Sequence, residues 1–122
     1  MKKISSEIIS AAVAVHRELG PGLFESVYQS CMIIEFHQRG MNFKSEVSAP
    51  VIYRGIKVHD EGFRLDFVVE DTVIVELKSV EKILQVHRKQ LLTYLRLAKK
   101  PLGLLINFNE EKLVDGITRI VN

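Results

Sequence analysis

The sequence has no tryptophan, a single cysteine and a formal net charge of only +2 over 122 residues. One cysteine, Cys31, allows no disulfide within the chain, which favours a reducing compartment, so we expect a cytoplasmic protein. The low net charge excludes a polycation, and any affinity for nucleic acid must come from a local patch. Aromatic residues make up only 7% of the chain, which argues against a single-strand binder built on base stacking.

Long hydrophobic runs are also absent. No segment approaches the roughly 18 apolar residues that are needed to span a bilayer, and we expect no membrane contact. The segment after Lys2 and Lys3 is amphipathic and interrupted by charges, which is wrong for a signal peptide. No repeat, linker or low-complexity segment is present, and 47% hydrophobic and 26% charged residues are ordinary for a globular protein. We expect a single domain over residues 1–122.

Hydrophobic periodicity predicts an α/β protein with the element order α-α-β-β-β-α-β-β, in which helices flank a mixed sheet. We expect Ser5 or Ser6 to cap the first helix and Pro50 to mark an edge position or a bulge. The unbroken β-branched run of residues 73–75 is typical of a strand that is covered on both faces. The predicted helices span about 5–19, 23–39 and 83–98. The predicted strands span 43–53, which resumes at 56–58 after a turn at Arg54-Gly55, and then 63–69, 73–78, 102–108 and 117–121.

The most informative residues are Asp66 and the triplet Glu76-Leu77-Lys78, at the two ends of a predicted hairpin. Glu76 and Lys78 are two apart on a strand and therefore project from the same face. Asp66 opposes Glu76 only if the turn is centred on Asp71, whereas a two-residue loop would place it opposite Leu77, on the wrong face. The functional interpretation therefore requires a loop of odd length or a bulge, and aspartate tolerates the left-handed conformation that such a loop needs.

The residue types suit a hard-cation site. Mg²⁺ or Mn²⁺ prefers oxygen ligands, which the carboxylates of Asp66 and Glu76 and the carbonyl of Leu77 would supply. Lys78 would orient the attacking water and stabilise negative charge at phosphorus. This arrangement predicts metal-assisted hydrolysis of a phosphodiester. The alternative is a solvated Glu–Lys pair on a strand, because an E-x-K triplet alone is common.

Two predicted helices carry further candidate residues. Glu25, near the start of the second helix, is either an accessory carboxylate or a partner of the helix dipole, and Tyr28 follows one turn later. On the third helix, His87, Gln90 and Tyr94 share one polar stripe and differ from the lysines and glutamates expected on a solvated face. We predict that Tyr28 and this stripe bind substrate.

Charge is segregated along the chain. Residues 60–76 contain six acids and one base, and residues 79–100 contain six bases and one acid. A carboxylate cluster followed by a basic helix suits a metal site beside a phosphate-binding surface, to which Arg88 and Lys89 would contribute. A solvated amphipathic helix explains the charge equally well. We expect a nucleic-acid partner, DNA rather than RNA, and specificity supplied by a homodimer or a protein partner, because the chain has little room for a recognition insertion.

These residues together resemble the PD-(D/E)XK nuclease superfamily: a helix with a glutamate, an acidic hairpin that ends in E-x-K, then a helix and a strand. Within that superfamily, residues 22–28 match the signature of the GxxExxY proteins at every fixed position. Residues 90–94 resemble the Q-x-x-x-Y element of some branches, and residues 103–108 are typical of the group. The resemblance covers nearly the whole chain.

The resemblance implies a restriction-endonuclease-like core and a Mg²⁺-dependent nuclease. It implies Asp66 and Glu76 as metal ligands, Lys78 as the catalytic lysine and Glu25 as an accessory carboxylate. Leu65 stands where the superfamily's motif name has proline, a position that varies. Two other functions stay open: a non-catalytic module that binds nucleic acid or protein, and a phosphoesterase for a small nucleotide, which a closed pocket would favour.

Overall fold

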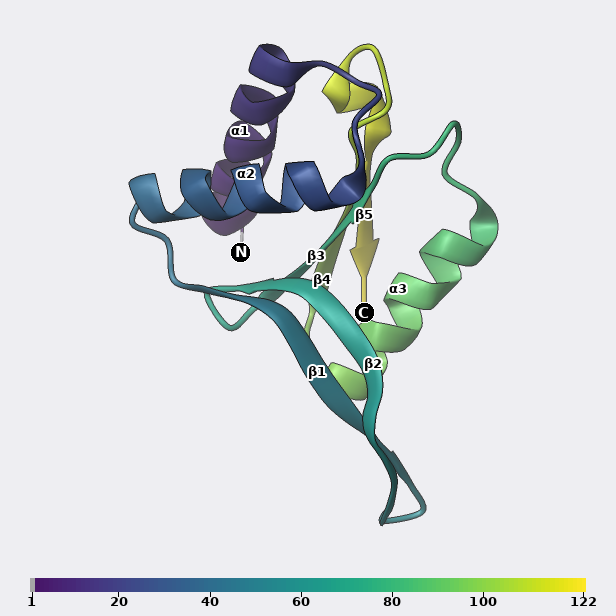
Figure 1. The fold of residues 1–122 in the computed structure, drawn as a ribbon. Helices are drawn as coiled ribbons and strands as arrows, with labels where there is room; N and C mark the ends of the chain where they lie inside the picture. The colour runs from purple at the N-terminus through teal and green to yellow at the C-terminus, as the bar shows by residue number, and fades with distance from the viewer. Residues whose placement is uncertain (1) are drawn as a thin grey trace.

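The computed structural model describes residues 2–122, and its elements follow the predicted order with one added 3₁₀ helix (Figure 1). The helices are α1 (Lys2–Leu19), α2 (Glu25–Gln38), α3 (Gln85–Ala98) and the 3₁₀ helix η1 (Leu113–Gly116). The strands are β1 (Phe43–Tyr53), β2 (Ile56–Val69), β3 (Val73–Lys78), β4 (Leu102–Asn107) and β5 (Ile117–Val121).

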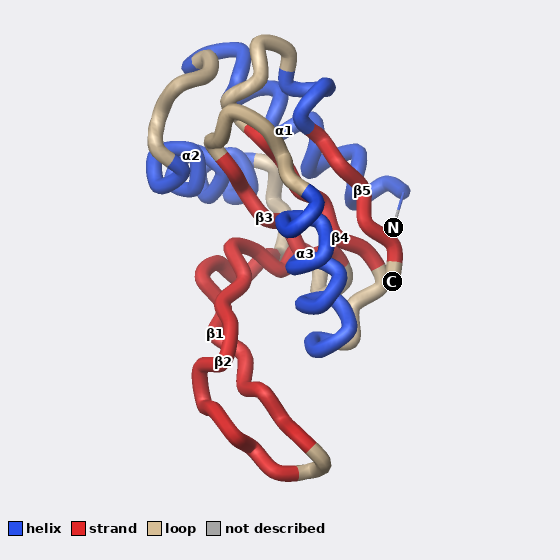
Figure 2. The backbone as a smooth tube through the Cα atoms, turned by 90° about the vertical axis from the view of Figure 1, so that its right-hand side faces the viewer, coloured by secondary structure: helices blue, strands red, loops and turns tan. Residues whose placement is uncertain are grey.

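The five strands form one mixed sheet in the order β1-β2-β3-β4-β5. Only the β3–β4 pair is parallel, and α3 makes the crossover between these two strands. The other neighbours are antiparallel. α1 and α2 cover one face of the sheet and α3 covers the other (Figures 1 and 2). The predicted α/β class and mixed sheet are therefore confirmed.

The sheet separates two hydrophobic cores. On the α1–α2 side, Phe36 and other apolar side chains of both helices pack on β3 and β4. On the α3 side, Leu91 and Leu95 pack on Ile74 and its neighbours. Residues 73–75 are fully buried, as predicted for a strand covered on both faces. A Cβ at Gly103 would lie 2.9 Å from the Leu91 side chain, so glycine lets α3 approach β4 closely.

The ends of the first two helices differ in how well they were predicted. The capping role of Ser5 and Ser6 is wrong, because α1 begins at Lys2 and both hydroxyls donate back to the Lys2 carbonyl, at 3.0 and 2.9 Å. Ser5 is buried inside the helix, on the face that meets the core. Gly40 follows the end of α2 in the left-handed conformation, with φ +66°, where glycine is favoured.

β1 and β2 form a long hairpin whose far end projects from the rest of the protein (Figures 1 and 2). Pro50 lies on the edge strand at a shift in register between Ala49 and Val51, as predicted. The predicted interruption between residues 58 and 63 is wrong, because β2 runs unbroken from Ile56 to Val69. Backbone pairing with β1 keeps this polar stretch extended, and side-chain periodicity does not report such pairing.

Candidate metal and catalytic site

The β2–β3 hairpin has the register that the site requires. Phe67 pairs with Val75 and Val69 pairs with Val73, which leaves a loop of three residues, 70–72. This is the odd-length loop that the sequence predicted, with Asp71 at its centre in the left-handed conformation at φ +55°. Extended by one position, the register places Asp66 opposite Glu76.

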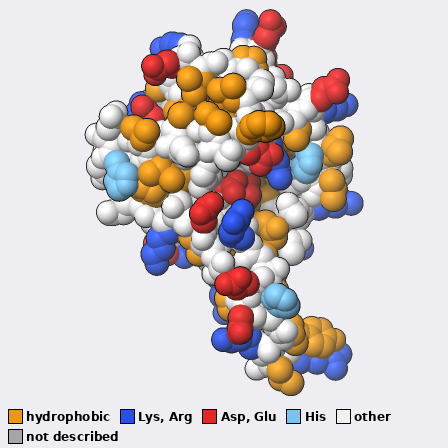
Figure 3. Space-filling view, in the orientation of Figure 1, with side chains coloured by type: hydrophobic (Ala, Val, Ile, Leu, Met, Phe, Trp, Pro, Cys, Tyr) orange, Lys and Arg blue, Asp and Glu red, His pale blue; other side chains and the backbone are white. Residues whose placement is uncertain are grey.

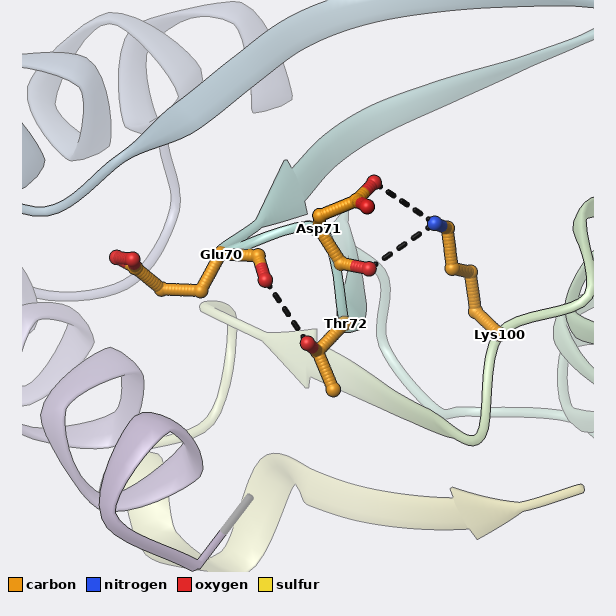
Figure 4. A network of polar contacts seen from close by, with 4 residues as sticks. All are labelled: Glu70, Asp71, Thr72 and Lys100. Carbon is orange, nitrogen blue, oxygen red and sulfur yellow. Dashed lines mark hydrogen bonds and ion pairs between the residues drawn. The ribbon is translucent and has the colours of Figure 1, made fainter.

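Lys100 holds this loop in place from the segment between α3 and β4 (Figure 4). Its ammonium donates to the Asp71 carboxylate at 2.8 Å and to the Asp71 carbonyl at 3.0 Å. The same ammonium lowers the pKa of Asp71. Thr72 closes the loop with a hydrogen bond from its hydroxyl to the Glu70 carbonyl, at 2.8 Å. The turn that sets the register is therefore anchored to the segment that leads into β4.

Asp66 and Glu76 lie where β2 and β3 separate. The Asp66 N–H donates to Glu76 Oε1 at 3.1 Å, and the Leu77 N–H donates to Asp66 Oδ2 at 2.8 Å. The strand ladder stops one pair earlier, so the two carboxylates accept hydrogen bonds that backbone carbonyls would otherwise take. β3 continues beside β4 through Lys78, while β2 turns away into the long hairpin (Figure 1).

Residues 63, 65, 67 and 69 would share one face of a flat strand, but β2 twists strongly at this point and they divide between the two cores. Phe63 and Leu65 pack in the core on the α3 side, whereas Phe67 and Val69 pack in the core on the α1–α2 side. On β1, the residue opposite Asp66 is Glu46, whose backbone is left-handed at φ +50°. A strict alternation rule assumes a flat strand, and the twist at the site breaks it.

Burial and nearby charges shift the pKa of Glu76, which is only 8% exposed. Burial first, and then the neighbouring Asp66 carboxylate, raise the pKa of Glu76 from 4.5 to about 8, against the opposing effects of the Asp66 N–H and the Lys78 ammonium. Burial, followed by the charges of Glu76 and Asp66, also raises the pKa of Tyr94. Asp66, Glu76, Lys78 and Tyr94 therefore act on one another within one site.

An open cleft of about 150 Å³ lies beside this pair. It brings Glu25, the first residue of α2, to the same place as Asp66 and Leu77. Gln29, one turn after Glu25, donates from Nε2 to the Asp66 carbonyl at 3.2 Å and ties α2 to β2. Figure 3 shows acidic and basic side chains gathered at the middle of this face. The complete lining is Glu25, Ser26, Gln29, Glu46, Arg64, Asp66 and Leu77.

The sequence interpretation missed several residues of the site. Gln29 lies four positions after Glu25 on the same helical face, a spacing that could have identified it. Glu46 and Arg64 come from the long hairpin, and no local pattern marks them. Asn107 is fully buried and brackets Val80, accepting from its N–H at 3.1 Å and donating to its carbonyl at 2.9 Å. Asn107 thereby fixes the chain just after Lys78.

The structure contradicts the predicted contact of Tyr28 with substrate. Tyr28 is fully buried, and its ring stacks on Phe108 with centroids 4.4 Å apart. Its hydroxyl donates to the Gly20 carbonyl at 2.6 Å and accepts from the Leu23 N–H at 3.2 Å. Residues three apart on a helix still differ in direction by about 60°. The packing of α2 on Phe108 turns Tyr28 into the core, while Glu25 faces the cleft. Tyr28 holds the turn that precedes α2.

No residue of the predicted stripe on α3 lines the cleft, and only Tyr94 is acted on by the charges of Glu76 and Asp66. Tyr94 is half-buried and stacks on Phe63, with centroids 4.9 Å apart. His87 lies beside a separate hollow that the loop after β3 lines, and its Nδ1 accepts from the Leu84 N–H at 3.0 Å. Arg88, Lys89 and Gln90 are exposed on the same helix.

The donor atoms suit a cation that keeps water ligands. Within residues 2–122 there is no group of three or more His, Cys, Asp or Glu side chains placed to bind a metal. Mg²⁺ in phosphate-processing sites is usually held by one or two carboxylates together with waters and substrate phosphates. Asp66 and Glu76, with a carbonyl such as that of Leu77, match this pattern. Two carboxylates forced together, with the pKa of Glu76 raised, are also what a cation would relieve.

The comparison with protein families identifies the class. The sequence model of the PD-(D/E)XK nuclease superfamily matches residues 2–120, so the chain belongs to this superfamily. The predicted superfamily resemblance is thus confirmed, and the sheet with its flanking helices agrees with the restriction-endonuclease-like fold. The comparisons with curated proteins and with solved structures find no match. No helix among residues 2–122 is long and apolar enough to cross a membrane.

Proposed function

We propose that this protein is a metal-dependent nuclease of the GxxExxY group that hydrolyses phosphodiester bonds in nucleic acid. The observation that carries the proposal is the Asp66–Glu76 pair at the separation of β2 and β3, held by reciprocal hydrogen bonds to the backbone. Superfamily membership gives the pair a chemical context, because nucleases of this class typically use divalent metals. The same pair would have no evident purpose in a purely structural hairpin, since burying two neighbouring carboxylates costs stability.

Asp66, Glu76 and the Leu77 carbonyl would hold Mg²⁺ or Mn²⁺. When bound, the metal would polarise a phosphoryl oxygen and neutralise the two carboxylates. Asp66 and Glu76 are already oriented by the backbone, so little rearrangement would be required to bind the ion. Glu25 faces the same cleft from the start of α2 and would act as an accessory carboxylate.

Lys78 would act on the reacting groups rather than on the metal. It is half-buried at the end of β3, and its ammonium already favours the ionised form of Glu76. From that position it would orient water for attack and stabilise the negative charge that develops on the phosphate. Asn107 would keep Lys78 in place by fixing the chain at Val80.

The substrate would lie over the cleft and α3. Arg88 and Lys89 are exposed there and would contact phosphates, while His87, Gln90 and Tyr94 would contact the strand near the site. The cleft volume, about 150 Å³, is below the roughly 300 Å³ of pockets that enclose small ligands. This favours an extended nucleic acid, DNA in our proposal, over a free nucleotide. We also propose a cytoplasmic location and a homodimer or a protein partner that supplies specificity.

A panel of labelled single- and double-stranded DNA and RNA, incubated with Mg²⁺ or Mn²⁺ and with EDTA, tests the proposal. We expect cleavage only with added metal, and its loss in Asp66→Asn. Asp115→Asn, an exposed carboxylate on η1, is the matched control and should cleave like the wild type. Cleavage of no substrate by the wild-type protein would contradict the proposal and favour a non-catalytic binding module.

A further inference from the structure

The far end of the β1–β2 hairpin has no partner in the fold. We call residues 51–62 the arm. All seven β2 residues of the arm, 56–62, are exposed, and the arm extends away from both cores (Figures 1 and 2). Ile52, Tyr53, Ile56 and Val58 are 58%, 59%, 67% and 56% exposed. Tyr53 and Ile56 pair directly across the two strands, and Val58 follows Ile56 on the same face, so three large apolar side chains are exposed together.

The tip of the arm, residues 52–59, contains bases and no acid and favours an anionic partner, whereas Asp60 and Glu61 lie at its base and balance the charge of the arm as a whole. Between Glu46 and Asp60 the chain has no acid, and this stretch carries Arg54, Lys57 and His59. The Arg54 guanidinium lies 5.2 Å from the centre of the Tyr53 ring, so a cation and an apolar ring are presented together. Lys57 has only an exposed contact with Asp60, at 3.5 Å, which a phosphate could replace easily.

The end of the arm is narrow and already ordered. Arg54 and Gly55 both have positive φ, +51° and +78°, in a two-residue loop between Tyr53 and Ile56. Two such residues form the tight turn that matches the natural twist of a hairpin. A Cβ on Gly62 would lie 2.2 Å from the Val51 side chain, so the two strands cross closely at the base of the arm. The arm is therefore a twisted two-stranded ribbon.

The reach of the arm matches a duplex. Ten residues separate Ile56 from Asp66 on β2, a span of about 33 Å at roughly 3.3 Å per residue. One turn of B-form DNA measures about 34 Å, and its major groove admits a two-stranded ribbon. The major groove of double-stranded RNA is too narrow and deep for such an element.

We propose that the arm is a duplex-DNA-binding element that lies in a groove up to about one helical turn from the phosphodiester in the cleft. This inference rests on the proposed nuclease function and makes double-stranded DNA its substrate. Arg54 and Lys57 contact phosphates, and Tyr53 and Ile56 pack on the groove wall. A DNA duplex that is too short to reach the arm should therefore bind more weakly than a duplex that is long enough to contact it.

Binding without divalent metal tests this proposal separately from cleavage. Affinity is measured for an 8-base-pair stem closed by a loop and for a 24-base-pair duplex. We expect the double variant Arg54→Ser/Lys57→Ser to lose about tenfold or more in affinity for the long duplex at about 0.1 M salt, and its log–log salt slope to become shallower by about two. The preference for the long duplex should fall with it. Lys2→Ser/Lys3→Ser removes the same charge from α1 and should leave that preference unchanged.

The outcomes separate the possible partners. Equal long-duplex affinity in the arm variant and the wild type would overturn the proposal. Equal losses for the short stem and the long duplex, or no duplex binding at all, would overturn it too. Sedimentation that shows a wild-type dimer, dissociated by Ile52→Ser/Ile56→Ser, would assign the arm to a second copy instead. If the arm variant loses duplex affinity but the wild type cleaves nothing with any metal, the arm stands and the nuclease function fails.

Discussion

The backbone N–H of Asp66 donates to the carboxylate of Glu76, and the carboxylate of Asp66 accepts from the next backbone N–H along β3, that of Leu77. This reciprocal pair closes the β2–β3 ladder where the strands part. It fixes two acidic side chains next to each other without a positive side chain between them. The proximity of the two carboxylates destabilises the folded protein locally, as expected where a cation binds.

The stability of the metal-free protein should depend on Glu76. Its pKa is raised from 4.5 to about 8 in the folded state, so the folded protein holds the proton more tightly than the unfolded chain. Stability should therefore fall as the pH rises from about 4.5 to 8 and level off above that range, by a few kcal/mol at most. Urea unfolding of the wild type and Glu76→Gln across this range measures the difference. Parallel pH profiles would show that Glu76 is not perturbed.

Divalent metal should stabilise the fold, because it binds the folded carboxylate pair and not the unfolded chain. At ten times the dissociation constant the gain is about 1.4 kcal/mol. The rise in Tm should be larger at pH 8 than at pH 6, since the proton on Glu76 competes with the metal at the lower pH. Asp66→Asn should reduce the rise and Asp115→Asn should not. A Tm that does not change in millimolar Mg²⁺ or Mn²⁺ would count against the site.

Tyr28 should matter for stability and not for direct substrate contact. Tyr28→Phe removes the hydroxyl that bonds Gly20 and Leu23 and leaves their backbone groups unpaired. We expect a loss of about 1–3 kcal/mol in the free energy of unfolding. Denaturant titration measures it, with Tyr53→Phe, an exposed tyrosine, as the control for the substitution. Equal free energies of unfolding for the two variants would show that the Tyr28 hydroxyl does not stabilise the fold.

The basic face of α3 should bind phosphate. Neutralising Arg88 and Lys89 together should weaken binding to DNA and make the salt dependence shallower, because about one counterion per lost contact is no longer released. Affinity measured against salt for Arg88→Ser/Lys89→Ser, beside Lys2→Ser/Lys3→Ser, decides the point. If the two double variants show the same slope, α3 is a solvated face and the substrate lies elsewhere.

Much of the site's framework was accessible from the sequence because it depends on local rules. Alternation along β3 and the need for Asp66 to face Glu76 together required a loop of odd length or a bulge around Asp71, and the structure has a loop of three residues. The β-branched run predicted the buried strand. The twist of β2 and the left-handed Glu46 depend on pairing between strands distant in the sequence. They could not be read from the sequence.

Tyr28 shows a second limit of the sequence. Its spacing from Glu25 placed it near the cleft, but the packing of α2 on Phe108 decides which way the side chain points. The capping prediction for Ser5 failed for a similar reason, since contact with the core extends α1 past the serines to Lys2. Helix spacing predicts neighbours along a helix and does not report how that helix is rotated against the sheet.

The central claim is that Lys78 acts in metal-dependent cleavage at the Asp66–Glu76 site. Single-turnover cleavage of a labelled 24-base-pair DNA duplex with Mg²⁺, compared between wild type and Lys78→Ala, tests it most directly when the metal-induced rise in Tm is recorded on the same preparations. We predict that Lys78→Ala loses cleavage by about a hundredfold or more while the rise in Tm stays close to that of the wild type. Equal cleavage rates in the two proteins would contradict the account.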